Sequence, residues 1–425
     1  MNRMSVPGLR SASIALIVGV CGAIAACGGS SNGGFGGYSP GPGSGSASGS
    51  GGGNGMNTVP VTVDVGPPAA GGSINTLYTT VTICAPGNST ECQTIDHVQV
   101  DTGSTGLRVL AAVLGNGLTA AQLPQARDAS GNPVDECAQF ADGYSWGTVR
   151  SADLLIGSET AAAVPIQVIG DTAAASIPAS CVMGPQEDSV QSFGANAILG
   201  IGNFLSDCGI ACEANPVAGA YYDCPPNAAC MPVAMPVTAQ LQNPVSLFAG
   251  DNNGVAIELP RVSTPAASVA GTMVFGIGTQ ADNAFPGAGN IYTVDPNYGT
   301  LTTLYNGGSY ASSFIDSGSN AYFFIDDAIP TCADQPSFYC PSSATSLTAV
   351  IEDGRGTQGS IAFAVDNADA DFASNAAALP NLAGPAGAGS MNAFDWGLPF
   401  FYGRQVYIAF ESNTVAGVGG PWIGF

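Results

Sequence analysis

Lysine is absent from this chain of 425 residues, and histidine occurs once, at position 97. Eight arginines stand against 31 acidic residues, which gives a formal net charge of −23 at pH 7. A surface this acidic repels phosphate groups, so nucleic acid and anionic lipid headgroups are not expected as partners. Because carboxylates lose their charge in acid, the composition suits work at low pH, although a need for solubility would also explain it.

A single histidine makes a serine or cysteine hydrolase a poor interpretation, because such enzymes need an imidazole base beside the nucleophile. His97 lies four residues before Asp101 on the same predicted strand, which is typical of a structural residue. Metal-binding pairs of the CxxC type are missing too, so neither a metal ion nor a cofactor is expected. Acidic residues gather at Asp366, Asp369 and Asp371, but they lack the glycine and glutamate of a calcium loop.

No apolar run near the start is long enough to span a membrane: IALIVGVCGAIAA, residues 14–26, is short and rich in alanine and glycine. It follows Arg3 and Arg10 and ends in Ile24-Ala25-Ala26-Cys27, which resembles a bacterial lipobox. That resemblance implies a lipoprotein signal peptide at residues 1–26 and a diacylated Cys27, and the glycine after it favours the outer membrane. The alternative is an ordinary secretory signal cut near Ala26.

Charged residues are also absent between residues 28 and 57, where glycine and serine dominate. Such a segment cannot bury a core and behaves as a flexible tether. Residues 27–57 are therefore interpreted as a lipid-anchored cysteine followed by a tether that holds a folded body away from the membrane. The expected localisation is the outer membrane, on either its periplasmic or its cell-surface face.

Cysteine is plentiful by comparison, with twelve residues, of which ten remain once Cys21 and Cys27 are set aside. An even number in an exported chain favours disulfides over metal ligands. The closely spaced pairs Cys84/Cys92 and Cys332/Cys340 are predicted to close hairpin-like loops. The pairing stays open among the other six, which are Cys137, Cys181, Cys208, Cys212, Cys224 and Cys230.

Helical periodicity is scarce, whereas period-two alternation recurs in short runs bounded by glycine, proline, asparagine and aspartate. Examples are LYTTVTI, GTVRSADLLIG, GTMVFGIG and QVYIAF. These runs predict an all-β chain with short turns, stabilised by sheet packing and by disulfides. Residues 203–240 stand apart as a predicted surface insertion, because they hold four cysteines and many prolines and alanines.

Two short motifs carry the strongest functional signal. VQVDTGSTGL, residues 98–107, places Asp101 after an apolar strand, and FIDSGSNAYFF, residues 314–324, does the same with Asp316. A single Asp-(Thr/Ser)-Gly triplet is expected by chance in a chain of this composition. A matched pair in separate halves of the chain indicates a duplicated lobe instead.

Paired carboxyl groups would explain the residue types in both motifs. Two carboxyl groups within hydrogen-bond distance share one proton, so one can act as general base on a water while the other acts as general acid. Asp101 and Asp316 are therefore the predicted catalytic residues. The supporting residues are Gly103 and Gly318 for close backbone approach, Thr102 and Ser317 for tying the loops together, and Ser104 and Ser319 for holding the outer carboxylate oxygens.

These motifs resemble those of the pepsin-like aspartic proteases, and the likeness covers nearly all of residues 70–425. NTLYTTVTI is similar to the first strand of that family, GYSWGTVRSADLLIG to its flap hairpin, and FGANAILGIG to the apolar-apolar-Gly motif beneath its first loop. The chain also resembles poorly characterised bacterial lipoproteins of this fold. The resemblance implies a monomer with an all-β, bilobal, pepsin-like fold, whose lobes at 58–283 and 284–425 hold a polypeptide substrate in the cleft between them.

Three positions depart from the family pattern. The flap tyrosine falls on Phe140, with Tyr144 offered only by a one-turn shift, and the tryptophan that partners it falls on Arg108. In FDWGLPFF, Asp395 stands where an apolar residue is expected. No segment like a propeptide lies between the lipobox and the first strand.

Two functions therefore stay open. The first is a membrane-anchored aspartic endopeptidase that hydrolyses peptide bonds at acidic pH, and the two intact aspartates favour it. The second is a catalytically inactive binding or surface-interaction lipoprotein with the same fold. The altered flap and the missing propeptide favour this second function.

Overall fold

The structure, a computed structural model, describes residues 57–425 apart from residues 282, 288 and 388–391. The predicted signal peptide at residues 1–26, Cys27 and the tether up to residue 56 lie outside the described residues. In the part that is described, no helix combines the length and the apolar character needed to cross a bilayer.

Strands dominate the described residues and fall into three sheets. The largest contains β1 (Thr58–Val63), β2 (Leu77–Ala85), β3 (Asn88–Asp101), β4 (Thr105–Leu110), β5 (Val134–Gln139), β6 (Tyr144–Ile156), β7 (Glu159–Ile169), β8 (Ala197–Ile201), β9 (Tyr221–Asp223), β10 (Met231–Pro232), β11 (Gly254–Glu258), β12 (Val269–Phe275), β13 (Ile291–Thr293), β21 (Gln405–Ala409) and β24 (Trp422–Gly424). The second contains β14 (Leu301–Tyr305), β15 (Gly308–Ile315), β16 (Tyr322–Phe323), β17 (Thr345–Glu352), β18 (Gln358–Val365), β19 (Ala383–Gly384) and β20 (Asp395–Trp396). The smallest pairs β22 (Thr414–Val415) with β23 (Val418–Gly419).

Helices are short and lie in the connections between strands. The α-helices of the described residues are α1 (Val190–Phe193), α2 (Gly209–Ala214) and α3 (Ala368–Ala373). The 3-10 helices are η1 (Pro68–Ala70), η2 (Ala111–Val113), η3 (Ala120–Gln122), η4 (Val237–Ala239), η5 (Pro244–Leu247) and η7 (Leu398–Phe401).

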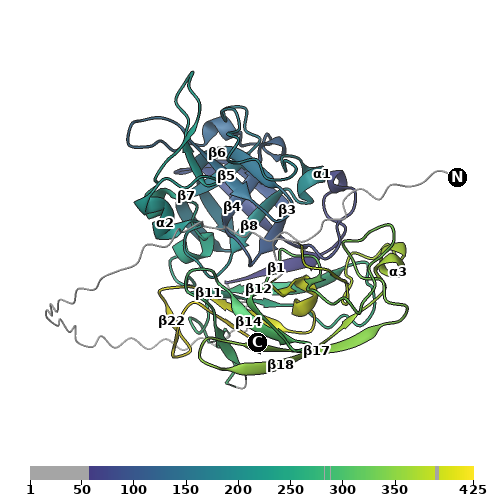
Figure 1. Ribbon diagram of the computed structural model, residues 1–425. Helices are drawn as coiled ribbons and strands as arrows, with labels where there is room; N and C mark the ends of the chain where they lie inside the picture. The colour runs from purple at the N-terminus through teal and green to yellow at the C-terminus, as the bar shows by residue number, and fades with distance from the viewer. Residues whose placement is uncertain (1–56, 282, 288, 388–391) are drawn as a thin grey trace, which may run out of the picture.

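The strands form two lobes, which Figure 1 shows one above the other. The upper lobe, blue to teal, holds β3 to β8, and the lower lobe, green to yellow, holds β14, β17 and β18. Strands β1, β11 and β12 lie between them. The prediction of an all-β, bilobal fold is confirmed.

The layer between the lobes is made by strands from both halves of the chain. β1 runs antiparallel to β12, with Thr58 opposite Val274 and Val63 opposite Val269. β12 pairs with β11, β11 with β21, and β21 with β24. Because β13, β21 and β24 come from residues 284–425, strands of both predicted lobes share one continuous sheet.

A repeated arrangement of strands positions the two aspartates. β3 ends at Asp101 and runs parallel to β8, which is antiparallel to β4. β15 leads directly to Asp316 and runs parallel to β20, which is antiparallel to β16. β4 and β16 each have a further parallel neighbour, β7 and β19 respectively. The two lobes therefore repeat one topology, as expected for a duplicated unit.

Burial follows the residue pattern of each strand. β17, with the sequence TSLTAVIE, buries alternate positions such as Ala349 and Ile351, as expected for a strand with one face on the core. β4, with the sequence TGLRVL, is buried along its whole length because it lies between β7 and β8. Arg108 is part of this strand, so its charge must be neutralised inside the lobe.

The predicted insertion at residues 203–240 forms α2, β9, β10 and η4. β9 pairs with β5, so the insertion extends the large sheet. Two short disulfides, Cys208–Cys212 and Cys224–Cys230, hold its loops.

Three further disulfides complete the set in the described residues. Cys84–Cys92 and Cys332–Cys340 are present, as predicted, and each closes a loop with a sequence separation of 8. The remaining bond, Cys137–Cys181, has a separation of 44 and joins β5 to the loop after β7. Sequence spacing alone did not assign this last pair.

Loop length predicts which of these bonds matters most for stability. Cross-linking a longer loop removes more entropy from the unfolded chain, so Cys137→Ala/Cys181→Ala should cost about 4 kcal/mol and Cys84→Ala/Cys92→Ala about 2.5 kcal/mol. Denaturant unfolding of both double variants would measure the difference. Equal losses would show that loop closure does not govern the contribution of these bonds, and free thiols in the oxidised wild type would show that the bonds are absent.

Candidate active site

The two motif loops meet at the junction of the lobes and are tied together by reciprocal hydrogen bonds. The Thr102 hydroxyl donates to Ile315 O at 3.2 Å and accepts from Ser317 N at 2.9 Å. In the mirror arrangement, the Ser317 hydroxyl donates to Val100 O at 2.8 Å and accepts from Thr102 N at 3.1 Å. Each hydroxyl therefore bridges the backbone of the opposite lobe, in the role that the sequence predicts for both residues.

Each aspartate is held by donors from its own loop. Asp101 Oδ1 accepts from Gly103 N at 2.8 Å, and Oδ2 accepts from the Ser104 hydroxyl at 2.5 Å. Asp316 repeats this pattern with the residues that follow it. Its Oδ1 accepts from Gly318 N at 2.7 Å and its Oδ2 from the Ser319 hydroxyl at 2.8 Å. Both carboxyl groups are buried, with 5% of Asp101 and 1% of Asp316 exposed.

The glycines of the two loops allow the carboxyl groups to come together. A Cβ placed on Gly318 would lie 2.6 Å from Asp101 Oδ1, and one placed on Gly103 would lie 2.8 Å from Asp316 Cγ. Each loop glycine therefore faces the aspartate of the other loop with no room for a side chain. This close approach is the structural reason for glycine at both positions.

Burial and neighbouring negative charges change the protonation of Asp316. The pKa of Asp316 is raised well above its ordinary value, first by burial and then by the negative charges of Asp101 and Asp395. Asp101 also hydrogen-bonds to it directly. The pair can therefore hold a proton that an isolated carboxyl group would release, which is the requirement for combined acid and base chemistry.

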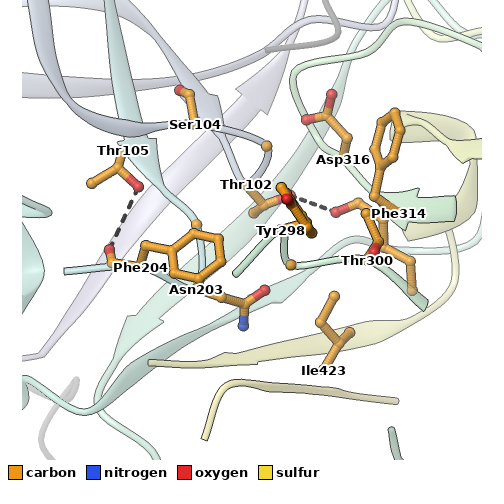
Figure 2. A pocket seen from close by; sticks show the side chains of 14 residues that line it. Thr102, Ser104, Thr105, Asn203, Phe204, Tyr298, Thr300, Phe314, Asp316 and Ile423 are labelled. Carbon is orange, nitrogen blue, oxygen red and sulfur yellow. Dashed lines mark hydrogen bonds between the residues drawn. The ribbon is translucent and has the colours of Figure 1, made fainter. Parts of the chain in front are cut away.

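A pocket lined by both lobes opens beside Asp316. Residues 102–105, Asn203 and Phe204 line it from the first half of the chain, and residues 298–300, 314–316 and Ile423 line it from the second half. Figure 2 shows Ser104 and Thr105 on one side and Phe314 and Asp316 on the other. A cleft lined by residues of both lobes is thus present beside Asp316, as the fold prediction required.

The predicted flap residues do not line this pocket. Phe140 lies at the turn between β5 and β6, is buried, and packs edge-on against Phe193 at 6.3 Å. Tyr144 is buried in a separate cluster with Trp146 and Tyr222. The hairpin itself is present at the predicted position, but its aromatic side chains pack into the N-terminal lobe.

The hairpin is fixed along both edges. β5 pairs with β9 of the insertion and carries the disulfide from Cys137 to Cys181. On the other edge, Tyr144 N donates to Pro185 O and Tyr144 O accepts from Glu187 N. The β5–β6 hairpin is therefore bonded to the rest of the N-terminal lobe along both edges and does not project freely over the cleft.

Arg108 takes part in this attachment. Its guanidinium donates to Glu136 of β5 at 2.6 Å and lies 3.2 Å from Asp207 of the insertion. Asp207 Oδ1 accepts from the Tyr221 hydroxyl at 2.6 Å, and burial together with the Glu136 charge raises the pKa of Asp207. One buried cation thus joins β4, the hairpin strand β5 and the insertion.

Several residues around the site were not predicted as site residues. Asp395 was noted only as a departure from the motif, yet the structure places it next to Asp316. Aligning FGANAILGIG with NAFDWGLPFF would have indicated that position, because both segments run beside an aspartate strand. The pocket residues Asn203, Phe204 and Tyr298 belong to no motif, so nothing in the sequence marked them.

The fold and the site define a bilobal all-β protein with two Asp-(Thr/Ser)-Gly loops paired across its cleft. The chain matches, over residues 53–425, the family described as protein of unknown function (DUF3443), and it belongs to that family. Among solved structures it is similar to the crystal structure of aspartic proteinase from Irpex lacteus, with 14% identity and a TM-score of 0.47. That match covers 86% of this chain and 96% of the other. No curated protein matches the chain.

The glycine contacts give a direct test of the geometry. Gly318→Ala should destabilise the protein by about 1–3 kcal/mol, because the added methyl group overlaps Asp101 and forces the loops apart. Gly354→Ala is the matched control, since nothing lies within 4 Å of the position its Cβ would take. Thermal unfolding of both variants would measure the effect, and equal stabilities would mean that the two loops do not approach this closely.

Proposed function

We propose that this protein is an aspartic endopeptidase that hydrolyses peptide bonds in polypeptides bound between its lobes. One observation carries the proposal: reciprocal hydrogen bonds from Thr102 and Ser317 hold two repeated loops together, so that their carboxyl groups face each other and the pKa of Asp316 is raised. The arrangement has the charge and the donors of a site that activates water.

The two carboxyl groups would divide the chemistry between them. Asp316, whose pKa is raised, carries the proton and donates it to the oxygen of the peptide carbonyl. Asp101 accepts a proton from the attacking water, so a C–O bond forms as the carbonyl π bond opens. The gem-diol intermediate then collapses: the C–N bond breaks, the leaving nitrogen takes the proton that Asp101 accepted from water, and Asp316 regains a proton from a hydroxyl group of the intermediate as the carboxylic acid product forms. The Thr102 and Ser317 bridges keep both carboxyl groups in place throughout.

Asparagine substitutions test this division of labour. Asp101→Asn removes the base and Asp316→Asn removes the shared proton, so each should abolish cleavage of denatured protein between about pH 3 and 6 while leaving the fold intact. In wild type, cleavage should fall as the pH rises through the pKa of Asp316, because the general acid is then lost. Peptide release with and without pepstatin, together with circular dichroism of each variant, would measure these effects. Proteolysis that survives either substitution would place the activity elsewhere.

A second candidate function is peptide binding without turnover. The observation that favours it is the attachment of the β5–β6 hairpin, which is held by Cys137–Cys181, by β9 and by the Arg108 ion network. A hairpin fixed in this way cannot fold down over a substrate as a mobile flap would. If wild type binds unfolded peptides at acid pH but releases no fragments, this second function is correct.

We also propose that Cys27 anchors the protein to a membrane through a lipid, as the Ile24–Cys27 motif suggests. Cys27→Ser should block acylation and move the protein from the membrane fraction to the soluble fraction. Fractionation of cells expressing each form would measure this. Cys21→Ser is the matched control, because Cys21 lies in the segment that signal cleavage would remove. The same distribution for wild type and Cys27→Ser would contradict the anchor.

A further inference from the structure

A third carboxyl group, that of Asp395, is buried beside the aspartate pair. Asp395 on β20 is opposite Phe314 on β15 in a parallel pairing, and Asp316 follows Phe314 by two residues. Paired residues of parallel strands point to the same side, as do residues two apart on one strand. The Asp395 side chain therefore lies on the face from which Asp316 projects, with only 1% of the residue exposed.

The internal repeat shows what this position holds in the other lobe. On β8, the residue opposite Gln99 is Ile198, and Gln99 precedes Asp101 by the same two residues. Ile198 is the counterpart of Asp395, and it is buried in an apolar cluster. The packing of this fold thus accepts an aliphatic side chain here, so a carboxyl group is not required by the sheet itself.

The surroundings of Asp395 provide no compensating charge. The hydrogen-bond partner that favours its ionised form is the Ser319 hydroxyl. That hydroxyl also donates to Asp316 Oδ2 at 2.8 Å, so two carboxyl groups depend on one donor. A buried ionised carboxyl group with so little compensation is costly, whereas a protonated one can donate to the Ser319 oxygen.

The titratable groups near Asp395 are either acidic themselves or interact with other residues. Asp316 at the end of β15 and Asp101 at the end of β3 are both close enough to interact electrostatically. On β16, Tyr322 pairs with Trp396 and interacts with Arg404. Among the described residues, no arginine forms an ion pair with any of the three carboxyl groups.

We propose that Asp395 is a positioning residue of the site: it completes a buried cluster of three carboxyl groups with Asp101 and Asp316, and its presence beside Asp316 keeps the Asp316 proton in place to higher pH. The inference deepens the proposed function and rests on it for its catalytic consequence. Asp316 is close to the negative charges of both Asp101 and Asp395, so its ionised form is less favourable than it would be beside Asp101 alone. Burial raises the pKa of Asp395 itself, in agreement with this.

The sign of the effect on stability follows from proton linkage. A carboxyl group whose folded pKa lies above its unfolded value binds more protons in the folded state, so stability falls as the pH rises. Asp395→Asn removes that loss. The melting temperature of this variant relative to wild type should therefore increase between about pH 4 and 7, by roughly 2–4 °C.

A double-mutant cycle on the full chain tests the cluster directly, and its readout does not depend on peptidase activity. Melting temperatures of wild type, Asp316→Asn, Asp395→Asn and the double variant are compared at pH 4 and pH 7. At pH 7 we expect the sum of the two single-variant increases in melting temperature to exceed the increase of the double variant, because either substitution relieves the same repulsion. The non-additivity should disappear near pH 4. Additive effects at both pH values would overturn the inference, whether or not the protein cleaves peptides.

The activity measurement uses a matched control. Asp371 on α3 is also buried, and burial with the Asp366 charge raises its pKa to about 7, but it lies outside the pocket. If the protein is a peptidase, Asp395→Asn should move the alkaline limb of the pH–rate profile toward acid by about one pH unit. Asp371→Asn should leave the limb in place, and an unshifted limb in Asp395→Asn would overturn the inference.

Asp395→Ile, which copies the residue of the other lobe, guards against a failure of the asparagine variant to fold. It should shift the alkaline limb in the same direction as Asp395→Asn, and an Asp395→Ile protein with the wild-type profile would also overturn the inference. If wild type has no peptidase activity but the melting temperatures of the variants are non-additive at pH 7, the proposed function is refuted and the three-carboxyl cluster is still supported.

Discussion

The exchange of hydrogen bonds between Thr102 and Ser317 is the contact on which the rest of the site depends. Each hydroxyl bonds to the backbone of the other lobe, so the two loops cannot separate without leaving buried donors and acceptors unpaired. Only with the loops in this register do Gly103 and Gly318 bring the two carboxyl groups into contact. The raised pKa of Asp316 is a consequence of that contact and of burial.

Buried acids recur in this protein, and they are accommodated in two different ways. In the N-terminal lobe, Arg108 lies between Glu136 and Asp207 and neutralises much of their charge. At the cleft no cation among the described residues is paired with Asp101, Asp316 or Asp395, so protons must take that role. A chain without lysine has few cationic side chains that could neutralise buried acids, and Arg108 lies with Glu136 and Asp207 rather than with the aspartate pair.

The sequence predicted most of the fold and the centre of the site, because both depend on local patterns. Alternating apolar residues indicated the strands, and the two Asp-(Thr/Ser)-Gly motifs indicated Asp101, Asp316 and their supporting hydroxyls. The bond from Cys137 to Cys181 could not be read from spacing, because it depends on where two distant loops meet. The packing of Phe140 against Phe193 could not be predicted for the same reason, because it depends on contacts between segments far apart in the sequence. The pairing of β5 with β9 of the insertion likewise has no sequence motif that marks it.

The sheet shared by the two lobes has a consequence for the order of events during folding. β11 finds its partner β21 about 150 residues later, and the Asn75 amide oxygen accepts from the Tyr402 hydroxyl across a separation of 327 residues. Contacts of such range form late, since a long loop must close before they contribute. A chain that stops before β21 and β24 therefore contains both aspartate motifs but lacks the strands that complete the sheet between the lobes.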